Sequence, residues 1–382
     1  MIKNKFFNAK YVMGALLSLI FLAIFSWKVV PKILEKIRTY EEANKKEIIT
    51  ETSVKTKIPI VLAFDNNYTC PALVFLQSLL KNANPGTFYE IIILVTNEFS
   101  RENKDKISKA GAGFKNFSVD FLDASQGSEQ FDDLNIFKER FTKEMFHRLK
   151  IPTLIKDKRK CLYLDVDIIV EGDLTELYNE DLNGYLIGGV ADGNRVSNKN
   201  SKAQKDMEKR KKWLEGLDID DEHDFVNSGV IVWNLDECRK ANLEKKFLEY
   251  IKKDHQGEVV NDQDTLNSRC HGRIKDLPLR FNTQTYFQLE SDYEDAGEFA
   301  AMFGKDVWNT ARTKPLIIHY ALDKPWAKLE TRFAGRWWKY ANESPNWIWQ
   351  EIKNYAKIFS DYRGNVGEEM QKVLKSRFFG SF

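Results

Sequence analysis

The sequence predicts an α/β domain built on a largely parallel sheet. Three short segments rich in β-branched and aromatic residues, at positions 58–65, 88–97 and 117–123, read as buried strands. Segments with helical apolar spacing lie between them, and strands that alternate with helices are typical of parallel sheets. The 382 residues are enough for one large domain, or for two ordinary ones, with a sizeable core.

The individual elements follow in chain order. "IPIVLAFD" is the first strand, and "CPALVFLQSLLKN" at 70–82 is a helix by its apolar spacing. "FYEIIILVTN" is the second strand, and the next helix runs over 100–113, with Ser100 as its N-cap and glycines at its end. "FSVDFLD" is the third strand. A helical segment at 135–158 then leads to "CLYLDVDIIVEGDL" from Cys161, which should add a further strand to the same sheet.

The N-terminus predicts a membrane anchor. Residues 11–27 carry no charge and are flanked by Lys10 and Lys28, a length that just suffices to span a bilayer. The alternative is a cleaved signal peptide, but no A-x-A-like cleavage site follows. We therefore divide the chain into an anchor at 1–30, a charged stem at 31–57, a catalytic domain at 58–325 and a C-terminal extension at 326–382.

Bulk composition excludes several classes of function. The net charge of +2 indicates no nucleic-acid partner. The four cysteines have no CxxC spacing, so neither a disulfide framework nor a zinc site is expected. The C-terminal extension is basic and rich in tryptophan, which suits either a helix at a membrane interface or an ordinary helical cap whose aromatics fill the core.

Two aspartates interrupt the apolar segment that begins at Cys161. Asp165 and Asp167 are two residues apart, so on a strand both side chains point to the same side. Two adjacent carboxylates repel each other and are costly to bury, unless a divalent cation lies between them. Ligands of open α/β sheets gather at the carboxyl ends of strands. The pair therefore predicts a site for Mn²⁺ or Mg²⁺ that also faces substrate phosphates.

Residues 58–326 resemble the family 8 glycosyltransferases, especially the bacterial lipopolysaccharide galactosyl- and glucosyltransferases. The resemblance rests on "AFDNNY" at 63–68, "FHRLKIPTLI" at 146–155, "YLDVDIIVEGDL" at 163–174, "FVNSGVIVWNL" at 225–235, "NDQDTLN" at 261–267 and "IIHYALDKPW" at 317–326, in that order. It implies a GT-A type, Rossmann-like fold that binds a nucleotide sugar, and retention of the anomeric configuration.

The resemblance also implies roles for single residues. His319 would be the third metal ligand beside Asp165 and Asp167. The residues that would bind the UDP-hexose donor through its nucleotide and diphosphate are Ala63, Asp65, Asn67, Tyr68, Arg148 and Lys324. Those that would face the reacting sugar are Asp192, Asn227, Asp262 and Gln263. One position departs from the family pattern, because Leu322 stands where the closing motif usually has glycine.

The expected function is metal-dependent transfer of galactose or glucose from a UDP-sugar to a glycan or glycolipid acceptor, such as lipopolysaccharide core. Two alternatives are a phosphatase of the haloacid-dehalogenase type and a non-catalytic, membrane-anchored protein that binds sugar nucleotides. The excess of Lys and Arg after the apolar segment favours a catalytic domain on the cytoplasmic face of a bacterial inner membrane. A lumenal, Golgi-type orientation is the alternative, although the glycosylation sequon at Asn67 would then lie inside the donor site.

Overall fold

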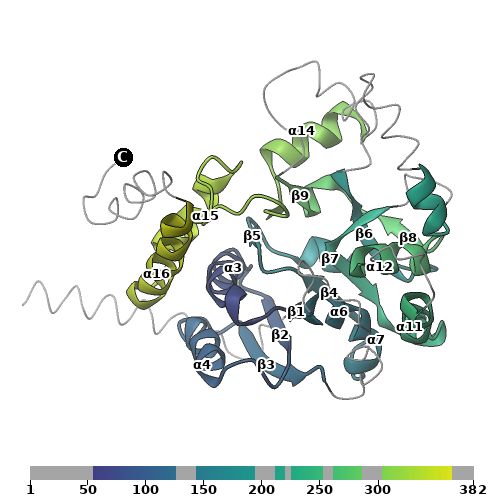
Figure 1. Cartoon of the computed structure of the whole chain (residues 1–382), viewed down its shortest axis with the longest axis horizontal. Helices are drawn as coiled ribbons and strands as arrows, with labels where there is room; N and C mark the ends of the chain where they lie inside the picture. Colours follow the sequence, from purple (N-terminus) through teal and green to yellow (C-terminus); the bar gives the residue numbers. More distant parts are fainter. Residues whose placement is uncertain are drawn as a thin grey trace, which may run out of the picture. The chain divides into compact units, whose positions relative to one another are not determined.

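A seven-stranded mixed sheet forms the centre of the protein in the computed structural model (Figure 1). The structure describes residues 55–125, 143–193, 211–219, 225–252, 261–285 and 303–363, which belong to one unit that begins at Lys55. The expected anchor at 1–30, and all but the last residues of the expected stem, lie outside these ranges. Within them, no helix is both long enough and apolar enough to cross a membrane.

The strand order of this sheet is β3-β2-β1-β4-β7-β6-β8. β7 runs antiparallel to both of its neighbours, and every other adjacent pair is parallel, which confirms the expectation of a largely parallel sheet. The strands are β1 (Thr56–Ala63), β2 (Thr87–Val95), β3 (Phe117–Asp123), β4 (Lys160–Leu164), β6 (Ile187–Ala191), β7 (Val226–Asn234) and β8 (Ile274–Asp276).

The strand expected from Cys161 is confirmed, and it ends at the aspartate pair as predicted. β4 ends at Leu164, directly before Asp165, and the chain then leaves this sheet. It continues as β5 (Ile168–Val170), which joins β10 (Ile317–His319) and β9 (Thr283–Gln284) in a separate three-stranded sheet. Both aspartates therefore lie in the connection between the two sheets, at the carboxyl end of β4.

Helices cover both faces of the central sheet, as the alternation of side chains along β1 shows. Ile60 and Leu62 pack into one apolar cluster and Val61 packs into the other. The first cluster includes side chains of α3 (Thr69–Lys81), α4 (Arg101–Ala110), α15 (Ala334–Glu343) and α16 (Asn346–Arg363). The second includes side chains of α7 (Ile151–Leu154), α10 (Leu235–Lys240), α11 (Leu243–Lys252) and α12 (Asp262–Cys270).

The sequence predicted the first two helices well and the third less well. α3 and α4 lie where they were expected, and the Ser100 side chain accepts a hydrogen bond from the Asn103 N–H, which confirms the N-cap. The described part of the helix expected at 135–158 is divided into α6 (Lys143–His147), the 3-10 helix η3 (Arg148–Lys150) and α7. Pro152 accounts for one break, because it has no N–H to continue a preceding helix.

The aromatic C-terminal segment packs on the same core as the sheet. Helices α15 and α16 lie beside α3 (Figure 1), and four tryptophans of the segment are buried: Trp326, Trp337, Trp338 and Trp349. The ring centroids of Trp326 and Trp337 are 5.3 Å apart. Because side chains that fill a core cannot also insert into a bilayer, the burial of these four favours the helical cap over the interfacial helix.

Candidate active site

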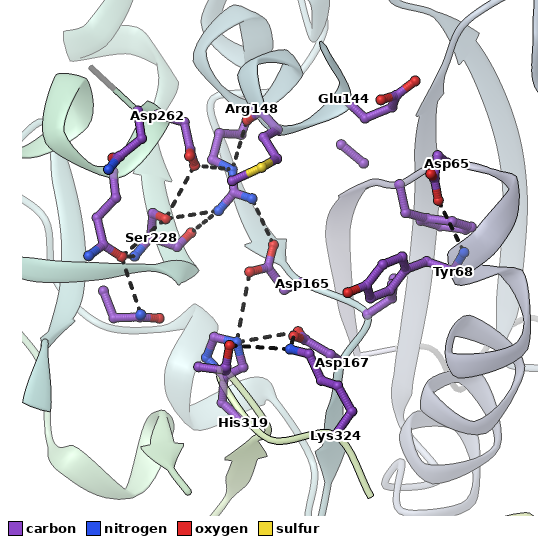
Figure 2. Close-up of a pocket in the computed structure, with 18 residues that line it drawn as sticks. Asp65, Tyr68, Glu144, Arg148, Asp165, Asp167, Ser228, Asp262, His319 and Lys324 are labelled. Atoms are coloured by element: carbon purple, nitrogen blue, oxygen red, sulfur yellow. Dashed lines mark hydrogen bonds and ion pairs between the residues drawn. The ribbon is translucent and has the colours of Figure 1, made fainter. Parts of the chain in front are cut away.

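A cavity of about 600 Å³ opens where β1 and β4 end. All of the predicted site residues except Asn67 and Asp192 line it. Figure 2 shows Asp65 and Tyr68 on one side, Ser228 and Asp262 on the other, and Asp165 between them. Sequence reasoning missed several other lining residues: Phe64, Glu144, Met145, Val166, Ser228, Asn261 and Ala321.

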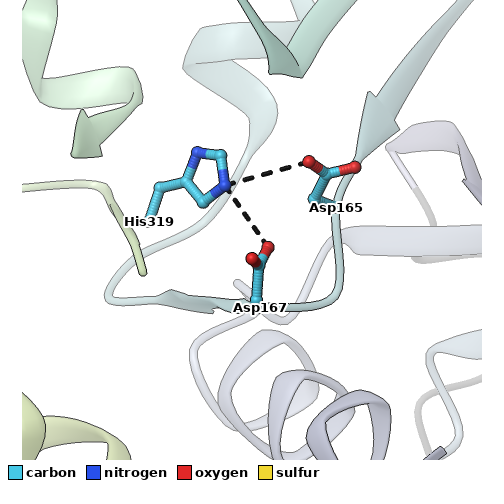
Figure 3. A group of neighbouring side chains, drawn as sticks. All are labelled: Asp165, Asp167 and His319. Carbon is cyan, nitrogen blue, oxygen red and sulfur yellow. Dashed lines mark ion pairs between the residues drawn. The ribbon is translucent and has the colours of Figure 1, made fainter. Parts of the chain in front are cut away.

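Three of the predicted residues form a compact group of metal-ligand type. One side-chain donor atom from each of Asp165, Asp167 and His319 lies within 4.8 Å of the other two (Figure 3). His319 ends β10, whose antiparallel pairing with β5 sets it opposite Ile168, next to the turn that carries the aspartates. Its Nε2 atom is 3.3 Å from Oδ1 of Asp167 and 3.8 Å from Oδ2 of Asp165. The structure therefore brings together the three residues that the sequence proposed as ligands.

Two features of the group fit a cation. In the described part of the chain, the buried Oδ1 atom of Asp167 accepts no hydrogen bond, although two anionic side chains meet there. Residue 229 is glycine, and a Cβ at that position would lie 2.3 Å from Cε1 of His319 and 2.7 Å from Oδ2 of Asp165. The site thus contains an unsatisfied anionic oxygen, and only glycine at position 229 lets the imidazole and the carboxylate approach so closely.

Lys324 supplies positive charge beside this group. Its ammonium forms an ion pair with Asp167 and donates to the carbonyl oxygens of Tyr320 and Ala321, at 2.6 and 3.2 Å. Burial by itself would raise the pKa of the Asp167 carboxyl, but the ammonium of Lys324 outweighs burial and holds that pKa well below its usual range. Asp167 is therefore an anion at neutral pH.

Arg148 ties the metal-ligand group to the opposite wall of the cavity. Its guanidinium lies 3.0 Å from a carboxylate oxygen of Asp165 and 3.0 Å from one of Asp262, and it donates to the Ser228 carbonyl oxygen at 2.8 Å. It also stacks 4.5 Å from the ring centre of Tyr163. The expected contact of Arg148 with the donor stays a prediction, because in this structure the guanidinium holds the protein's own carboxylates in place.

An amide and carboxylate network forms the end of the cavity expected to hold the sugar. Asn227 donates through Nδ2 to Asp192 at 3.3 Å and to Oε1 of Gln263 at 3.2 Å. The Gln263 oxygen also accepts from the Ser228 N–H at 3.0 Å, and its Nε2 donates to Asp192 at 3.2 Å. Burial raises the pKa of the Asp262 carboxyl, with Arg148 acting in the opposite direction. The structure thus brings Asp192, Asn227, Asp262 and Gln263 together.

The nucleotide end is built on the loop after β1. Asp65 accepts from the backbone N–H groups of Asn67 and Tyr68, at 3.0 and 3.2 Å, so it caps the short helix η2 (Asn66–Tyr68) while it also lines the cavity. The Tyr68 ring packs edge-on against Trp326, with 6.3 Å between the ring centroids. Asn67 is exposed and outside the cavity lining, and Ala63 lies at the end of β1 in that lining.

Leu322, which replaces the usual glycine, leaves the cavity open. Its side chain is 68% exposed, and its neighbour Ala321 is the residue that lines the cavity. Leu322 is also absent from the residues with positive φ, so its backbone needs no glycine. The Leu322 side chain therefore does not block the cavity that the described residues form.

Comparisons with known proteins identify the family. The family profile described as "Glycosyl transferase family 8" matches residues 59–330. Over 278 residues the chain is 25% identical to "General stress protein A" of Bacillus subtilis (strain 168), covering 70% of this chain and 86% of that protein. It is 26% identical over 189 residues to the "Lipopolysaccharide 1,2-glucosyltransferase" of Escherichia coli (strain K12), covering 49% of this chain and 50% of that protein.

Solved structures share the fold. The bifunctional glycosyltransferase WbbM superposes with a TM-score of 0.63 at 22% identity, over 79% of this chain and 52% of that one. The galactosyltransferase LgtC, in complex with donor and acceptor sugar analogues, superposes with a TM-score of 0.57 at 22% identity, over 75% of this chain and 96% of that one. The fold is therefore of the GT-A type, and the haloacid-dehalogenase alternative is wrong. Because the profile spans the sheet and every predicted site residue, the chain belongs to glycosyl transferase family 8 and is a glycosyltransferase.

Proposed function

We propose that the protein is a metal-dependent, retaining glycosyltransferase that moves galactose or glucose from a UDP-hexose to a glycan or glycolipid acceptor. One observation carries the proposal: a single cavity joins the Asp165, Asp167 and His319 group to the network around Asn227 and Gln263. The first suits a cation with the phosphates it binds, and the second suits sugar hydroxyls. The E. coli relative named for transfer onto lipopolysaccharide supports a glycolipid acceptor.

The chemistry of the ligand set favours Mn²⁺ over Mg²⁺. Asp165 and Asp167 offer carboxylate oxygens, which suit both ions, whereas the imidazole of His319 suits the softer of the two. When bound, the cation would neutralise the charge that develops on the departing diphosphate. Lys324 lies beside Asp167 and would place a fixed positive charge near the same phosphates.

The protein's own groups would orient the donor. Asp65 and Tyr68 line the end of the cavity toward the loop after β1, where a base and ribose would lie. Asp262 and the amide of Asn227 would hold sugar hydroxyls in a fixed geometry, with Asp192 behind them. Arg148 forms ion pairs with Asp165 and Asp262 and so holds the two carboxylates in fixed positions. We propose that Arg148 acts on the donor mainly through these two carboxylates.

Gln263 is the residue that we place beneath the reacting sugar. An amide is a poor nucleophile, so its contribution would be electrostatic, directed at the positive charge that develops on the sugar ring. Its Oε1 atom already accepts hydrogen bonds from Ser228 and Asn227. Those bonds hold the amide in one orientation, and they also give Gln263 a part in fixing Asn227.

We also propose that residues 1–30 anchor the protein in a membrane, with the catalytic domain on the cytoplasmic face of a bacterial inner membrane. The support is the charge-free segment at 11–27 and the excess of Lys and Arg that follows it. A lumenal orientation is the alternative. Protease accessibility of the catalytic domain in intact inverted membrane vesicles distinguishes the two orientations.

The experiment that tests the enzymatic proposal is a donor screen. The full-length protein in detergent is incubated with Mn²⁺ and each member of a panel of UDP-sugars, and release of UDP is measured with and without EDTA. We expect hydrolysis of UDP-galactose or UDP-glucose that EDTA abolishes, and none by the Asp165→Ala variant. Binding of UDP-sugars without any turnover, even with glycan and glycolipid acceptors, would instead identify a non-catalytic binding protein.

A further inference from the structure

Asn282 has a buried side-chain amide that contacts both the metal-ligand group and the network around Asn227. The sequence predicted it neither as a metal ligand nor as a residue that faces the donor. Asn282 follows the 3-10 helix η6 (Leu279–Phe281), is 0% exposed, and directly precedes β9. Its Nδ2 atom donates to Oδ1 of Asn227 at 2.9 Å, and its Oδ1 atom lies 3.0 Å from Nδ1 of His319. A buried amide is costly unless both ends are paired, and here the two partners are a proposed metal ligand and a proposed sugar contact.

A backbone N–H fixes which group donates and which accepts in the hydrogen bonds that link Asn227, Asn282 and His319. The Gly229 N–H can only donate, and it donates to Asn227 at 3.1 Å, so the atom of Asn227 that it meets is the carbonyl oxygen. The Asn282 atom that meets the same oxygen must then be its NH₂ group. The remaining end of the Asn282 amide is the oxygen, and it can only accept. His319 therefore carries a proton on Nδ1 and donates it to Asn282.

A second acceptor confirms the orientation of Asn227 independently. The other end of its amide meets Asp192, and the Asp192 carboxylate can accept but not donate when it is ionised. The assignment of oxygen and nitrogen in Asn227 is therefore fixed from both ends. With Nδ1 of His319 protonated, Nε2 is the ring nitrogen left for a metal, and Nε2 is the atom that faces Asp165 and Asp167.

We infer that Asn282 is a positioning residue that selects the ligating nitrogen of His319 and couples the metal ligand to Asn227. The inference rests on the proposed function, since it concerns the metal and donor-sugar contacts of the same site. Outer-sphere partners of ligating histidines of this kind orient the ring and raise its basicity. Because one amide serves both residues, loss of Asn282 should weaken metal binding and the recognition of the sugar together.

Strand β9, which follows Asn282, contributes a second buried amide with both ends hydrogen-bonded. Thr283 and Gln284 are consecutive residues of β9, so their side chains point to opposite sides of the strand. Gln284 is also 0% exposed; it accepts from the Gly193 N–H at 3.1 Å and donates to the Ala191 carbonyl oxygen at 3.0 Å, which holds the segment that carries Asp192. Thr283 instead donates to the carbonyl oxygen of Ala311, outside the cavity lining.

Thr283 supplies a matched control for Asn282. Thr283→Val removes a buried hydrogen bond one residue away, keeps the shape of the side chain and touches no site residue. Asn282→Leu removes both contacts of the amide. Asn282→Asp keeps an oxygen that can accept from Nδ1 of His319, but it cannot donate to Asn227. The three variants therefore separate a loss of stability, a loss of both contacts and a loss of the Asn227 contact alone.

The test measures binding rather than turnover. Free Mn²⁺ is counted by its electron paramagnetic resonance signal in titrations of the full-length protein with saturating UDP. We expect Asn282→Leu to raise the dissociation constant for Mn²⁺ by about 10–100-fold. Asn282→Asp and Thr283→Val should stay within a few-fold of the unchanged protein. With saturating Mn²⁺, calorimetry should show that Asn282→Asp has lost the advantage of UDP-hexose over UDP, whereas Thr283→Val keeps it.

Protein labelled with ¹⁵N-histidine gives a readout that needs no metal. The imidazole nitrogen shifts of His319, assigned with a His319→Gln variant, should report a proton on Nδ1 that is retained in Asn282→Asp. A proton on Nε2 alone in the unchanged protein would overturn the inference. So would Mn²⁺ binding by Asn282→Leu as tight as that of the unchanged protein, or equal weakening in the Leu and Asp variants. If the unchanged protein binds no Mn²⁺ even with UDP, both this inference and the proposed function are wrong.

Discussion

Gly229 lies directly against the imidazole of His319, so that a Cβ at position 229 would come within 2.3 Å of the ring. The same added carbon would be 2.7 Å from a carboxylate oxygen of Asp165. Neither neighbour can yield easily, because Asn282 holds the ring and Arg148 holds the carboxylate. The glycine that follows Asn227 and Ser228 along β7 is therefore part of the metal-ligand group, although it contributes no ligand.

This contact predicts the effect of Gly229→Ala. The methyl group must displace His319 or Asp165, so we expect the affinity for Mn²⁺ to fall by at least about tenfold and the rate of transfer to fall with it. Gly335→Ala is the matched control, because a Cβ at position 335 in α15 meets nothing within 4 Å. Equal Mn²⁺ affinity in the two variants would show that the ring and carboxylate have room to move.

Removal of either carboxylate should abolish most of the transfer activity. Asp165→Ala and Asp167→Ala each delete a proposed ligand, and the loss of Lewis-acid stabilisation should lower the rate by orders of magnitude. Titration of EDTA into the unchanged protein should produce the same loss, and added Mn²⁺ should restore it. Full activity in EDTA, with both substitutions harmless, would be incompatible with a metal-dependent mechanism.

Substitution of Gln263 should have a smaller effect. Gln263→Ala removes one oriented dipole and the acceptor for Ser228 and Asn227, so we expect the turnover number to fall by roughly one to two powers of ten. Nuclear magnetic resonance of the product from an α-linked UDP-hexose should show the α anomer. A β product would mean that the reaction proceeds with inversion, and the role given to Gln263 would then have to be abandoned.

Substitution of a buried tryptophan in the C-terminal segment should destabilise the fold. Trp337 is 0% exposed and packs against Trp326 and Trp338, so Trp337→Ala should lower the free energy of unfolding by about 3–5 kcal/mol. Denaturant unfolding measures this directly. Binding of a protein without residues 1–30 to anionic liposomes should be the same with and without the substitution; weaker binding in the variant would indicate that this tryptophan contacts lipid.

Leu322→Gly tests whether the departure from the family pattern matters. The leucine side chain is exposed and its backbone does not require glycine, so kcat/KM for the UDP-hexose should change by no more than a few-fold. A large gain in kcat/KM would mean that the leucine hinders closure of the loop over the donor. The comparison uses initial rates at subsaturating donor, where kcat/KM is read directly.

Local pattern was enough to predict the central strands and the helices between them. β1, β2 and β3 are short segments rich in β-branched and aromatic residues, and α3 and α4 have helical periodicity, so each element is encoded by neighbours in the sequence. The pair Asp165 and Asp167 was recognisable for the same reason, because charge at the end of an apolar strand conflicts with burial. Similarity of ordered motifs then pointed to His319, Asn227 and Gln263, which pattern alone would not have selected.

Only the tertiary structure decided how these residues are held. Asn282, Ser228 and Gly229 carry no signal in a single sequence, since a buried amide, a serine and a glycine are common in any loop or strand. Their function arises from contacts over long separations along the chain: Asn282 meets His319 and Asn227 because β9 pairs with β10, and Asn227 lies at the beginning of β7. The sequence by itself determined which side chains carry the chemistry, whereas the packing of two sheets determined their orientation, because hydrogen-bond direction depends on partners that no local pattern specifies.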